Sequence, residues 1–214
     1  MDRNSQIDTF CRYSQVSRET IISLNNYEKI LIKANKKLNL IGKSTEKNIW
    51  IRHFLDSFQV IDFIDKNDDN LVDLGSGAGF PGLILAIAAN DRKIPLKVKL
   101  IEKSPKKIKF LEEIISQLNL NVVVYNQNIL ESEKNLQGSI FVARAFKPLE
   151  VILKLMHNKA KNFKKIFIYL GKTAKHEIIQ ASKNWDIKYK QRVSITSTDS
   201  LVIEINKIEK KQIE

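Results

Sequence analysis

The chain has 214 residues, a formal net charge of +12 and one cysteine, Cys11. This length allows one domain with a sizeable core and an extension, and a single cysteine excludes a disulfide framework and a cysteine-rich zinc site. No apolar run is long enough to cross a membrane and the N-terminus has no signal-peptide character, so we expect a cytoplasmic protein. We also expect a monomer and no metal site.

The first 64 residues have the pattern of a helical extension. Within residues 18–39, apolar side chains recur at the three- and four-residue spacing of one helix face, at Leu24, Tyr27, Leu31, Ala34 and Leu38. Residues 39–42 interrupt the pattern. The hydroxyl groups of Ser44 and Thr45, followed by polar residues from Glu46, suit the start of a second helix, whose apolar positions continue to Ile61. We therefore predict a helical N-terminal extension over residues 1–64 and a main domain over residues 65–214.

From residue 70 onward, predicted strands alternate with predicted helices. Five short apolar runs are the expected strands, at residues 70–74, 96–101, 121–125, 139–143 and 165–170. Helices are expected at residues 81–89 and from Ser104, a suitable cap before Pro105. Residues 193–195 and 201–205 are expected to form a closing antiparallel pair. The alternation predicts an α/β fold, with a largely parallel, Rossmann-like sheet and helices on both faces.

Polar residues follow the ends of several predicted strands. They are Asp73, Glu102, Asn128, Arg144 and the pair Gly171-Lys172. Because ligands bind at the carboxyl ends of parallel strands, this placement predicts a single site at one edge of the sheet.

The loop after the first strand carries the most specific pattern, an acid followed by three alternating glycines. Glycine is favoured where φ is positive or where a ligand approaches the backbone. The pattern is typical of the nucleoside-side loop of S-adenosylmethionine (AdoMet) methyltransferases, and Glu102, at the tip of the next strand, can accept both ribose hydroxyls of such a cofactor. The candidate cofactor-binding residues of the loop are Asp73, Gly75, Ser76, Gly77, Gly79 and Phe80.

The same loop also permits a dinucleotide site. Gly77-Ala-Gly79-Phe-Pro-Gly82 satisfies the G-x-G-x-x-G fingerprint, with Glu102 20 residues beyond its last glycine. This reading leaves Gly75 unexplained and gives no role to Asp73, so we consider it the weaker interpretation. It would correspond to an NAD(P)-dependent oxidoreductase.

Two absent motifs restrict the methyl acceptor. Methylation of carbon 5 of a pyrimidine requires a cysteine nucleophile, and Cys11 lies upstream of every predicted strand. Methylation of an exocyclic amine usually requires an Asn/Asp-Pro-Pro-aromatic loop, whereas no two prolines of this chain are adjacent. The remaining acceptors, such as nitrogen 7 of guanine and some oxygens, attack the sulfonium unaided, so no catalytic nucleophile is expected.

Six motifs occur in one order along the chain: Asn39-Leu40, Arg52-His53-x-x-Asp56-Ser57, Asp73-x-Gly-x-Gly-x-Gly-x-Pro-Gly, the lysine-rich residues 106–110, Arg144-Ala145-Phe146 and Leu170-Gly171-Lys172. In this the chain resembles the bacterial 16S rRNA guanine-N7 methyltransferases, formerly called glucose-inhibited division protein B, over nearly its whole length. The resemblance implies an AdoMet-dependent Rossmann-like domain that acts on a guanosine in small-subunit rRNA, either as 16S rRNA or in the small ribosomal subunit.

The resemblance also assigns roles to residues. Gly75 and Phe80 would contact the cofactor in the glycine loop, Glu102 would hold the ribose, and Arg144 would lie beside the cofactor. The adenine would lie against residues that follow the third strand, Asn128, Ile129 and Leu130. Candidate rRNA contacts are Arg52, His53, Lys106 and Lys172.

The residues themselves leave some roles open. An arginine after a buried strand needs a partner, and the methionine carboxylate of AdoMet or an RNA phosphate would satisfy Arg144. Arg52 and Asp56 have the spacing of a simple ion pair on a helix surface.

The basic charge lies in the flanks of the chain. Formal net charges are +4 over residues 1–57, −1 over residues 58–143 and +9 over residues 144–214. Basic surfaces bind phosphate-rich partners, which favours a nucleic acid, although 29 lysines against 7 arginines can also reflect coding bias. A non-catalytic rRNA-binding assembly factor with the same fold stays open as an alternative.

Overall fold

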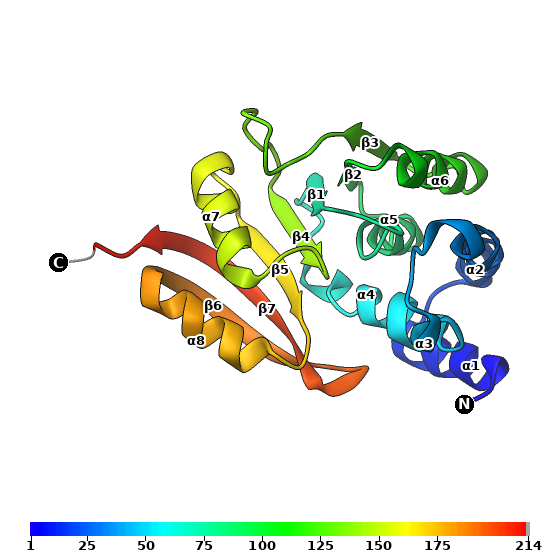
Figure 1. Ribbon diagram of the computed structural model, residues 1–214. Helices are drawn as coiled ribbons and strands as arrows, with labels where there is room; N and C mark the ends of the chain where they lie inside the picture. Colours follow the sequence, from blue (N-terminus) through cyan, green and yellow to red (C-terminus); the bar gives the residue numbers. More distant parts are fainter. Residues whose placement is uncertain (213–214) are drawn as a thin grey trace.

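The computed structural model describes residues 1–212, and a seven-stranded sheet forms its centre (Figure 1). Five strands run parallel to one another: β1 (Asn70–Leu74), β2 (Lys97–Glu102), β3 (Val122–Asn126), β4 (Ile140–Arg144) and β5 (Lys165–Leu170). The order across the sheet is β3-β2-β1-β4-β5-β7-β6. The predicted Rossmann-like sheet is confirmed, and its strand order reverses between β1 and β4, where such folds bind ligands.

Helices cover both faces of the sheet. On one face, α5 (Gly82–Asp91) and α6 (Pro105–Gln117) share a buried cluster with the N-terminal helices. On the other face, α7 (Leu149–Lys159) and α8 (Ala174–Asn184) contribute to a second cluster. Consecutive β1 residues belong to different clusters, Leu71 to the first and Val72 to the second, because side chains of a strand alternate between its two faces.

The N-terminal helices pack against the first face. The predicted helix at residues 18–39 is α2 (Arg18–Leu38). The helix that precedes it, α1 (Arg3–Ser14), lies within the predicted helical extension, but the sequence analysis assigned no helix to those residues. α1 buries three residues, of which only Phe10 is apolar, so it has no apolar stripe that periodicity can detect. Phe10 packs edge-on against Trp50, with ring centroids 5.4 Å apart.

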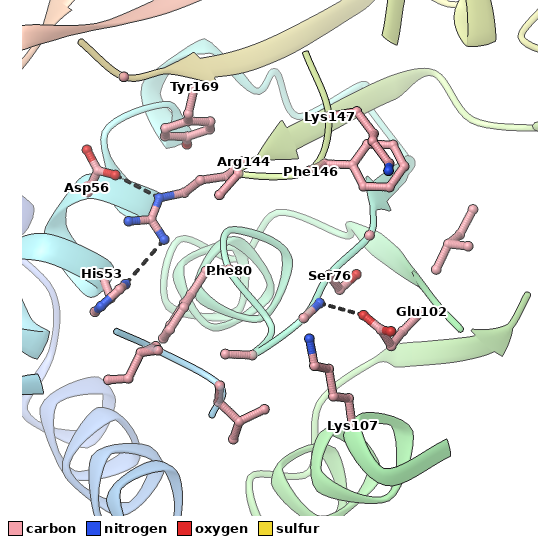
Figure 2. A pocket seen from close by; sticks show the side chains of 18 of the residues that line it. His53, Asp56, Ser76, Phe80, Glu102, Lys107, Arg144, Phe146, Lys147 and Tyr169 are labelled. Atoms are coloured by element: carbon pink, nitrogen blue, oxygen red, sulfur yellow. Dashed lines mark hydrogen bonds and ion pairs between the residues drawn. The ribbon is translucent and has the colours of Figure 1, made fainter. Parts of the chain in front are cut away.

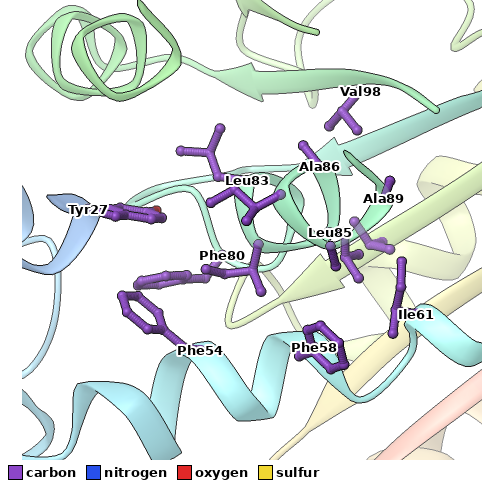
Figure 3. Packing of buried hydrophobic residues seen from close by; sticks show 14 of the residues in the cluster. Tyr27, Phe54, Phe58, Ile61, Phe80, Leu83, Leu85, Ala86, Ala89 and Val98 are labelled. Atoms are coloured by element: carbon purple, nitrogen blue, oxygen red, sulfur yellow. The ribbon is translucent and has the colours of Figure 1, made fainter. Parts of the chain in front are cut away.

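Aromatic side chains connect the N-terminal helices to the glycine loop. The ring of Phe80 stacks on Tyr27 at a centroid distance of 5.6 Å and lies 6.0 Å from Phe54, as Figure 3 shows. The Tyr27 hydroxyl also donates a hydrogen bond to the Ala78 carbonyl within the loop. The N-terminal helices therefore support the glycine loop through Tyr27 and Phe54.

The second predicted helix is broken into short pieces. They are α3 (Lys43–Glu46), the π-helix η1 (Trp50–Leu55), α4 (Asp56–Phe58) and the 3-10 helix η2 (Ile61–Phe63). A π-helical turn is rare and occurs frequently at functional sites. Here it carries Arg52 and His53, two of the predicted rRNA contacts.

The closing hairpin is longer than expected. β6 (Trp185–Ser194) and β7 (Ser197–Lys210) form an antiparallel pair that joins the sheet through β7 and β5. The turn lies at residues 194–197, rather than between the expected strands at residues 193–195 and 201–205. β6 is an edge strand with mostly exposed polar residues, which explains why its length was underestimated. Among residues 1–212, no helix combines the length and apolar character needed to cross a membrane.

Candidate functional site

A cavity of about 690 Å³ opens at the carboxyl ends of the parallel strands. It is bordered by the glycine loop after β1, the ends of β2, β4 and β5, the loop after β3, the π-helix η1 and the β6–β7 turn (Figure 2). The volume lies within the range of cavities that bind small molecules and cofactors. The predicted single site at this edge of the sheet therefore corresponds to a cavity.

Asp73 does not line the cavity but contacts the end of the glycine loop, at Gly82. Its side chain is fully buried, and one carboxylate oxygen accepts a hydrogen bond of 2.9 Å from the Gly82 amide. Burial is the largest influence on this carboxyl group and raises its pKa to about 7. The first amide of α5 thus satisfies Oδ2 of the acid, whereas Oδ1 is buried and has no hydrogen-bond partner among the described residues.

Gly75 and Gly82 allow close approaches of neighbouring side chains to the loop. A Cβ atom at Gly75, where φ is +73°, would lie 2.2 Å from the ring of Phe146. At Gly82 it would lie 2.6 Å from the Asp73 carboxylate. Both glycines are therefore required by the packing of the loop itself.

Glu102 ties the glycine loop to the end of β2. One carboxylate oxygen accepts hydrogen bonds from the amides of Lys103 and Ser104, both at 2.9 Å, and the other accepts one from Gly77 at 3.0 Å. A carboxylate has about four acceptor positions, so roughly one remains for a ligand. With these three contacts in place, Glu102 can accept a hydrogen bond from one ribose hydroxyl rather than from both, as the sequence suggested.

The loop after β3 borders the same end of the cavity with Asn128, Ile129 and Leu130. Ile129 is buried and Leu130 is 40% exposed. The ammonium group of Lys159, at the end of α7, donates hydrogen bonds to the carbonyls of Ile129 (2.9 Å), Leu130 (3.3 Å) and Ser132. The lysine thereby holds the loop in place.

Arg144 lies at the other end of the cavity and is bound by the protein itself. Its Nε donates to Asp56 Oδ2 at 2.8 Å and its terminal nitrogens approach the Arg52 carbonyl at 2.6 Å and His53 Nδ1 at 3.3 Å. The guanidinium also lies 5.9 Å from the centre of the Phe80 ring. The structure thus provides an internal partner where the sequence suggested a cofactor carboxylate or a phosphate, and Asp56 pairs with Arg144 rather than with Arg52.

His53 is held in its neutral form. Burial, followed by the charges of Arg144 and Arg52, lowers its pKa to about 3. Because Arg144 can only donate, Nδ1 of the imidazole accepts and Nε2 donates to the Thr45 hydroxyl at 2.9 Å. The ring also stacks on Phe80, with centroids 5.0 Å apart.

Most of the predicted site residues lie together around the cavity. Those that line it are Arg52, His53, Gly75, Ser76, Gly77, Phe80, Glu102, Asn128, Ile129, Leu130 and Arg144. Four do not line it: Asp73, Gly79, Lys106 and Lys172. Gly79 instead lies against Leu83 and Tyr27, where an added Cβ would meet both within 2.6 Å.

The cavity also has charged and aromatic residues that the sequence analysis did not assign. They are Asp56, Lys103, Lys107, Phe146, Lys147 and Tyr169. Lys107 points toward Glu102 from α6 (Figure 2), whereas Lys106 is exposed and turned away, because consecutive helix residues differ in direction by about 100°. The motifs quoted in the sequence analysis contain a signal for Asp56, Lys107 and Phe146, whereas Lys103, Lys147 and Tyr169 could be assigned only from the fold.

Comparisons with known proteins identify the family. The family described as GidB, rRNA small subunit methyltransferase G, matches residues 20–204. This chain belongs to that family. It is 41% identical over 198 residues to the ribosomal RNA small subunit methyltransferase G of Pelagibacter ubique, with 92% of each chain covered. The Rickettsia akari protein of the same name is 37% identical over 196 residues, which cover 92% of this chain and 98% of that protein.

Solved structures agree on the fold. A TehB-like SAM-dependent methyltransferase from Corynebacterium glutamicum aligns with a TM-score of 0.52 and 14% identity, over 73% of this chain and 88% of its own. MtNAS, in a complex with S-adenosylmethionine, aligns with a TM-score of 0.58 and 11% identity, over 87% of this chain and 75% of its own. The predicted family, enzyme class and cofactor, AdoMet, are confirmed, and the oxidoreductase interpretation is set aside.

Proposed function

We propose that the protein transfers the methyl group of AdoMet to nitrogen 7 of a guanosine in 16S rRNA. The observation that carries this proposal is one cavity in which the glycine loop, Glu102 and the Arg52–Arg144 region meet, in a member of the small-subunit rRNA methyltransferase G family. We further propose that it acts as a cytoplasmic monomer on 16S rRNA or on the small ribosomal subunit.

The residues at the Glu102 end fit a nucleoside. Glu102 retains one acceptor position for a ribose hydroxyl, and Ile129 with Leu130 offers apolar surface to an adenine. The Asn128 side chain is also at this turn, where its oxygen accepts a hydrogen bond from the Leu130 amide at 3.3 Å. We propose that the adenosine half of AdoMet lies here and that its methionine half extends past Gly75 and Phe80 toward Arg144.

The reaction that we propose requires no covalent intermediate. The lone pair on nitrogen 7 attacks the methyl carbon, the bond from sulfur to that carbon breaks, and the positive charge moves from the sulfonium to the guanine ring. Cys11 lies in α1 and does not line the cavity, so it cannot supply a nucleophile there. The protein therefore contributes by aligning the two reactants.

Basic side chains at the mouth of the cavity suit an RNA strand. Arg52, Lys103, Lys107 and Lys147 line it, whereas its two carboxylates, Asp56 and Glu102, are occupied by internal contacts. We propose that these basic residues bind phosphates of the target strand, with Lys106 and Lys172 as contacts outside the cavity. His53, neutral and largely buried, is proposed to support the acceptor side through Phe80 and Arg144.

The test is methyl transfer from labelled AdoMet to small ribosomal subunits from a strain that lacks this activity. Borohydride and aniline cleavage then locates 7-methylguanosine in the 16S rRNA. One new cleavage site is expected. AdoMet binding with no incorporation into RNA would favour the non-catalytic assembly factor, and incorporation without a cleavage site would indicate a different acceptor atom.

A further inference from the structure

Asp56 lies at the acceptor end of the cavity, and the roles proposed above leave it without a function. It is the acid of the Arg-His-x-x-Asp-Ser motif and follows directly after the π-helix η1. Its side chain is 13% exposed and belongs to the chain segment that borders the cavity opposite Glu102. Figure 2 shows its carboxylate directed at Arg144.

The carboxylate of Asp56 makes four hydrogen bonds. Oδ2 accepts from Arg144 Nε at 2.8 Å, and Oδ1 accepts from the hydroxyls of Ser194 (3.0 Å) and Thr196 (2.8 Å). Oδ1 also accepts from the side-chain amide of Gln59 at 3.0 Å. Each carboxylate oxygen has about two acceptor positions, so Oδ1 is saturated and Oδ2 keeps about one. Asp56 therefore acts mainly through the groups that it holds.

Those groups come from segments far apart in the sequence. Arg144 ends β4, and Ser194 and Thr196 belong to the β6–β7 turn. The next residue, Ser57, accepts a hydrogen bond of 2.9 Å through its carbonyl from the Tyr169 hydroxyl of β5. The Asp56 segment therefore joins three neighbouring parts of the cavity wall.

Arg144 keeps free donors after these contacts. Its guanidinium has five N–H groups, and the three contacts with Asp56, His53 and the Arg52 carbonyl use three of them. Arg144 also lines the cavity, at the end away from the proposed adenosine position. An arginine held in this way presents its remaining donors with little loss of side-chain entropy on binding.

We propose that Asp56 is a positioning residue for methyl transfer, which fixes the Arg144 guanidinium at the acceptor end and compensates its charge. The inference rests on the proposed function. The S–C bond breaks as the N–C bond forms, so positive charge leaves the sulfonium and develops on the guanine ring. An uncompensated guanidinium beside that ring opposes this development, whereas the Asp56–Arg144 pair presents the same donors without a net charge.

The Asp56→Asn variant tests this inference because it keeps the shape of the side chain and removes its charge. We expect kcat at saturating AdoMet and saturating small subunits to fall on the order of tenfold to a hundredfold, the size of the effect of a misplaced catalytic group. The Kd for AdoMet, measured by calorimetry, should change by a smaller factor than kcat, since only the methionine half of the cofactor approaches Arg144 while its adenosine half binds at the other end.

Two variants serve as controls. Asp62→Asn removes an Asp–Arg pair of the surface, with Arg92 at 2.5 Å, and should leave both constants unchanged. Thr196→Val removes one hydrogen bond to Asp56 and keeps the charge, so it should lower kcat in the same direction by only about a few fold. It also provides a second measurement if Asp56→Asn does not fold.

The two levels of the proposal fail differently. Absence of transfer by the wild-type protein overturns the proposed function and this inference with it. Transfer by the wild type together with an unchanged kcat in Asp56→Asn and Thr196→Val overturns the inference alone. A loss of rate that saturating AdoMet restores also overturns it, because Asp56 would then act on cofactor binding.

Discussion

The loop after β1 has no room for a side chain at Gly75. A Cβ atom there would lie 2.2 Å from Phe146, and φ is +73°. We expect Gly75→Ala to destabilise the protein by about 2 kcal/mol or more and to weaken AdoMet binding, because Phe146 and the loop must both move. Urea unfolding and AdoMet titration measure the two effects.

Gly171 supplies the matched control for that substitution. It also lines the cavity, but an added Cβ would have no neighbour within 4 Å. Gly171→Ala should therefore change the free energy of unfolding by less than about 0.5 kcal/mol. Equal destabilisation by the two variants would contradict the assigned role of the Gly75–Phe146 contact.

Asp73 makes the stability of the fold depend on pH. Burial raises the pKa of this carboxyl from 3.8 to about 7, so the folded state holds the proton more tightly than the unfolded state. The stability that the group contributes is complete below about pH 4 and is lost as the pH rises through about 7. This shift in pKa corresponds to a change of about 4 kcal/mol in the free energy of protonating Asp73 between the unfolded and the folded state.

Asp73→Asn should remove this dependence. The amide has no charge to desolvate, and its oxygen can still accept the hydrogen bond from Gly82. Between pH 5 and 9, at roughly one-unit steps, we expect the free energy of unfolding to fall less for the variant than for the wild type. Parallel pH profiles of the two proteins would show that Asp73 does not titrate in this range.

At the scale of elements, the sequence predicted those with strong periodicity. The five parallel strands were found as short apolar runs, and α2 was found because its apolar residues repeat at the spacing of one helix face. α1 and most of β6 were missed because each buries few apolar side chains. The π-helix η1 was read as part of a regular helix, since the i+5 hydrogen bonding of Trp50–Leu55 leaves no mark on the spacing of apolar residues.

Helix α7 and the loop after β3 are coupled through one side chain. Lys159 donates to the carbonyls of Ile129, Leu130 and Ser132, and this loop borders the proposed adenine position. Lys159→Met retains the length of the aliphatic chain and removes the ammonium. We expect it to raise the Kd for AdoMet on the order of tenfold, with little change in the affinity for RNA.

The control for this coupling is Lys154→Met in the same helix, because Lys154 is exposed. It should leave the affinity for AdoMet unchanged. Competition between AdoMet and its product measures both variants under the same conditions. If the two methionine variants bind AdoMet alike, the lysine does not organise the loop.

At the scale of the whole molecule, the sequence located the edge of the sheet that carries the site but not the pairing within it. Glu102 and Arg144 were placed there because the carboxyl ends of parallel strands meet. The Asp56–Arg144 pair joins residues 88 positions apart, and no local pattern encodes such a contact. The sequence also could not show that Lys107 rather than Lys106 of α6 lines the cavity, because this depends on the orientation of the helix against the sheet.

The distribution of charge over the molecule gives the last prediction. Lys107 and Lys147 line the cavity, whereas Lys66 precedes β1 and Lys97 is the first residue of β2, at the opposite edge of the sheet. Each phosphate contact contributes roughly 0.7 to 0.9 to the slope of log K against log salt concentration. The double variant Lys107→Gln with Lys147→Gln should therefore reduce that slope by about 1.5 for small-subunit rRNA.

The variant Lys66→Gln with Lys97→Gln makes the same change in net charge away from the cavity. If RNA enters at the cavity mouth, this variant should keep the wild-type slope in filter-binding or fluorescence titrations. A reduction of the same size in both double variants would mean that overall charge, rather than the cavity mouth, governs the affinity for RNA. Within residues 1–212, none of these four lysines forms a hydrogen bond or ion pair with Glu102 or Asp56, so the affinity for AdoMet should change little in either variant. This measurement separates a loss of RNA contacts from damage to the cofactor site.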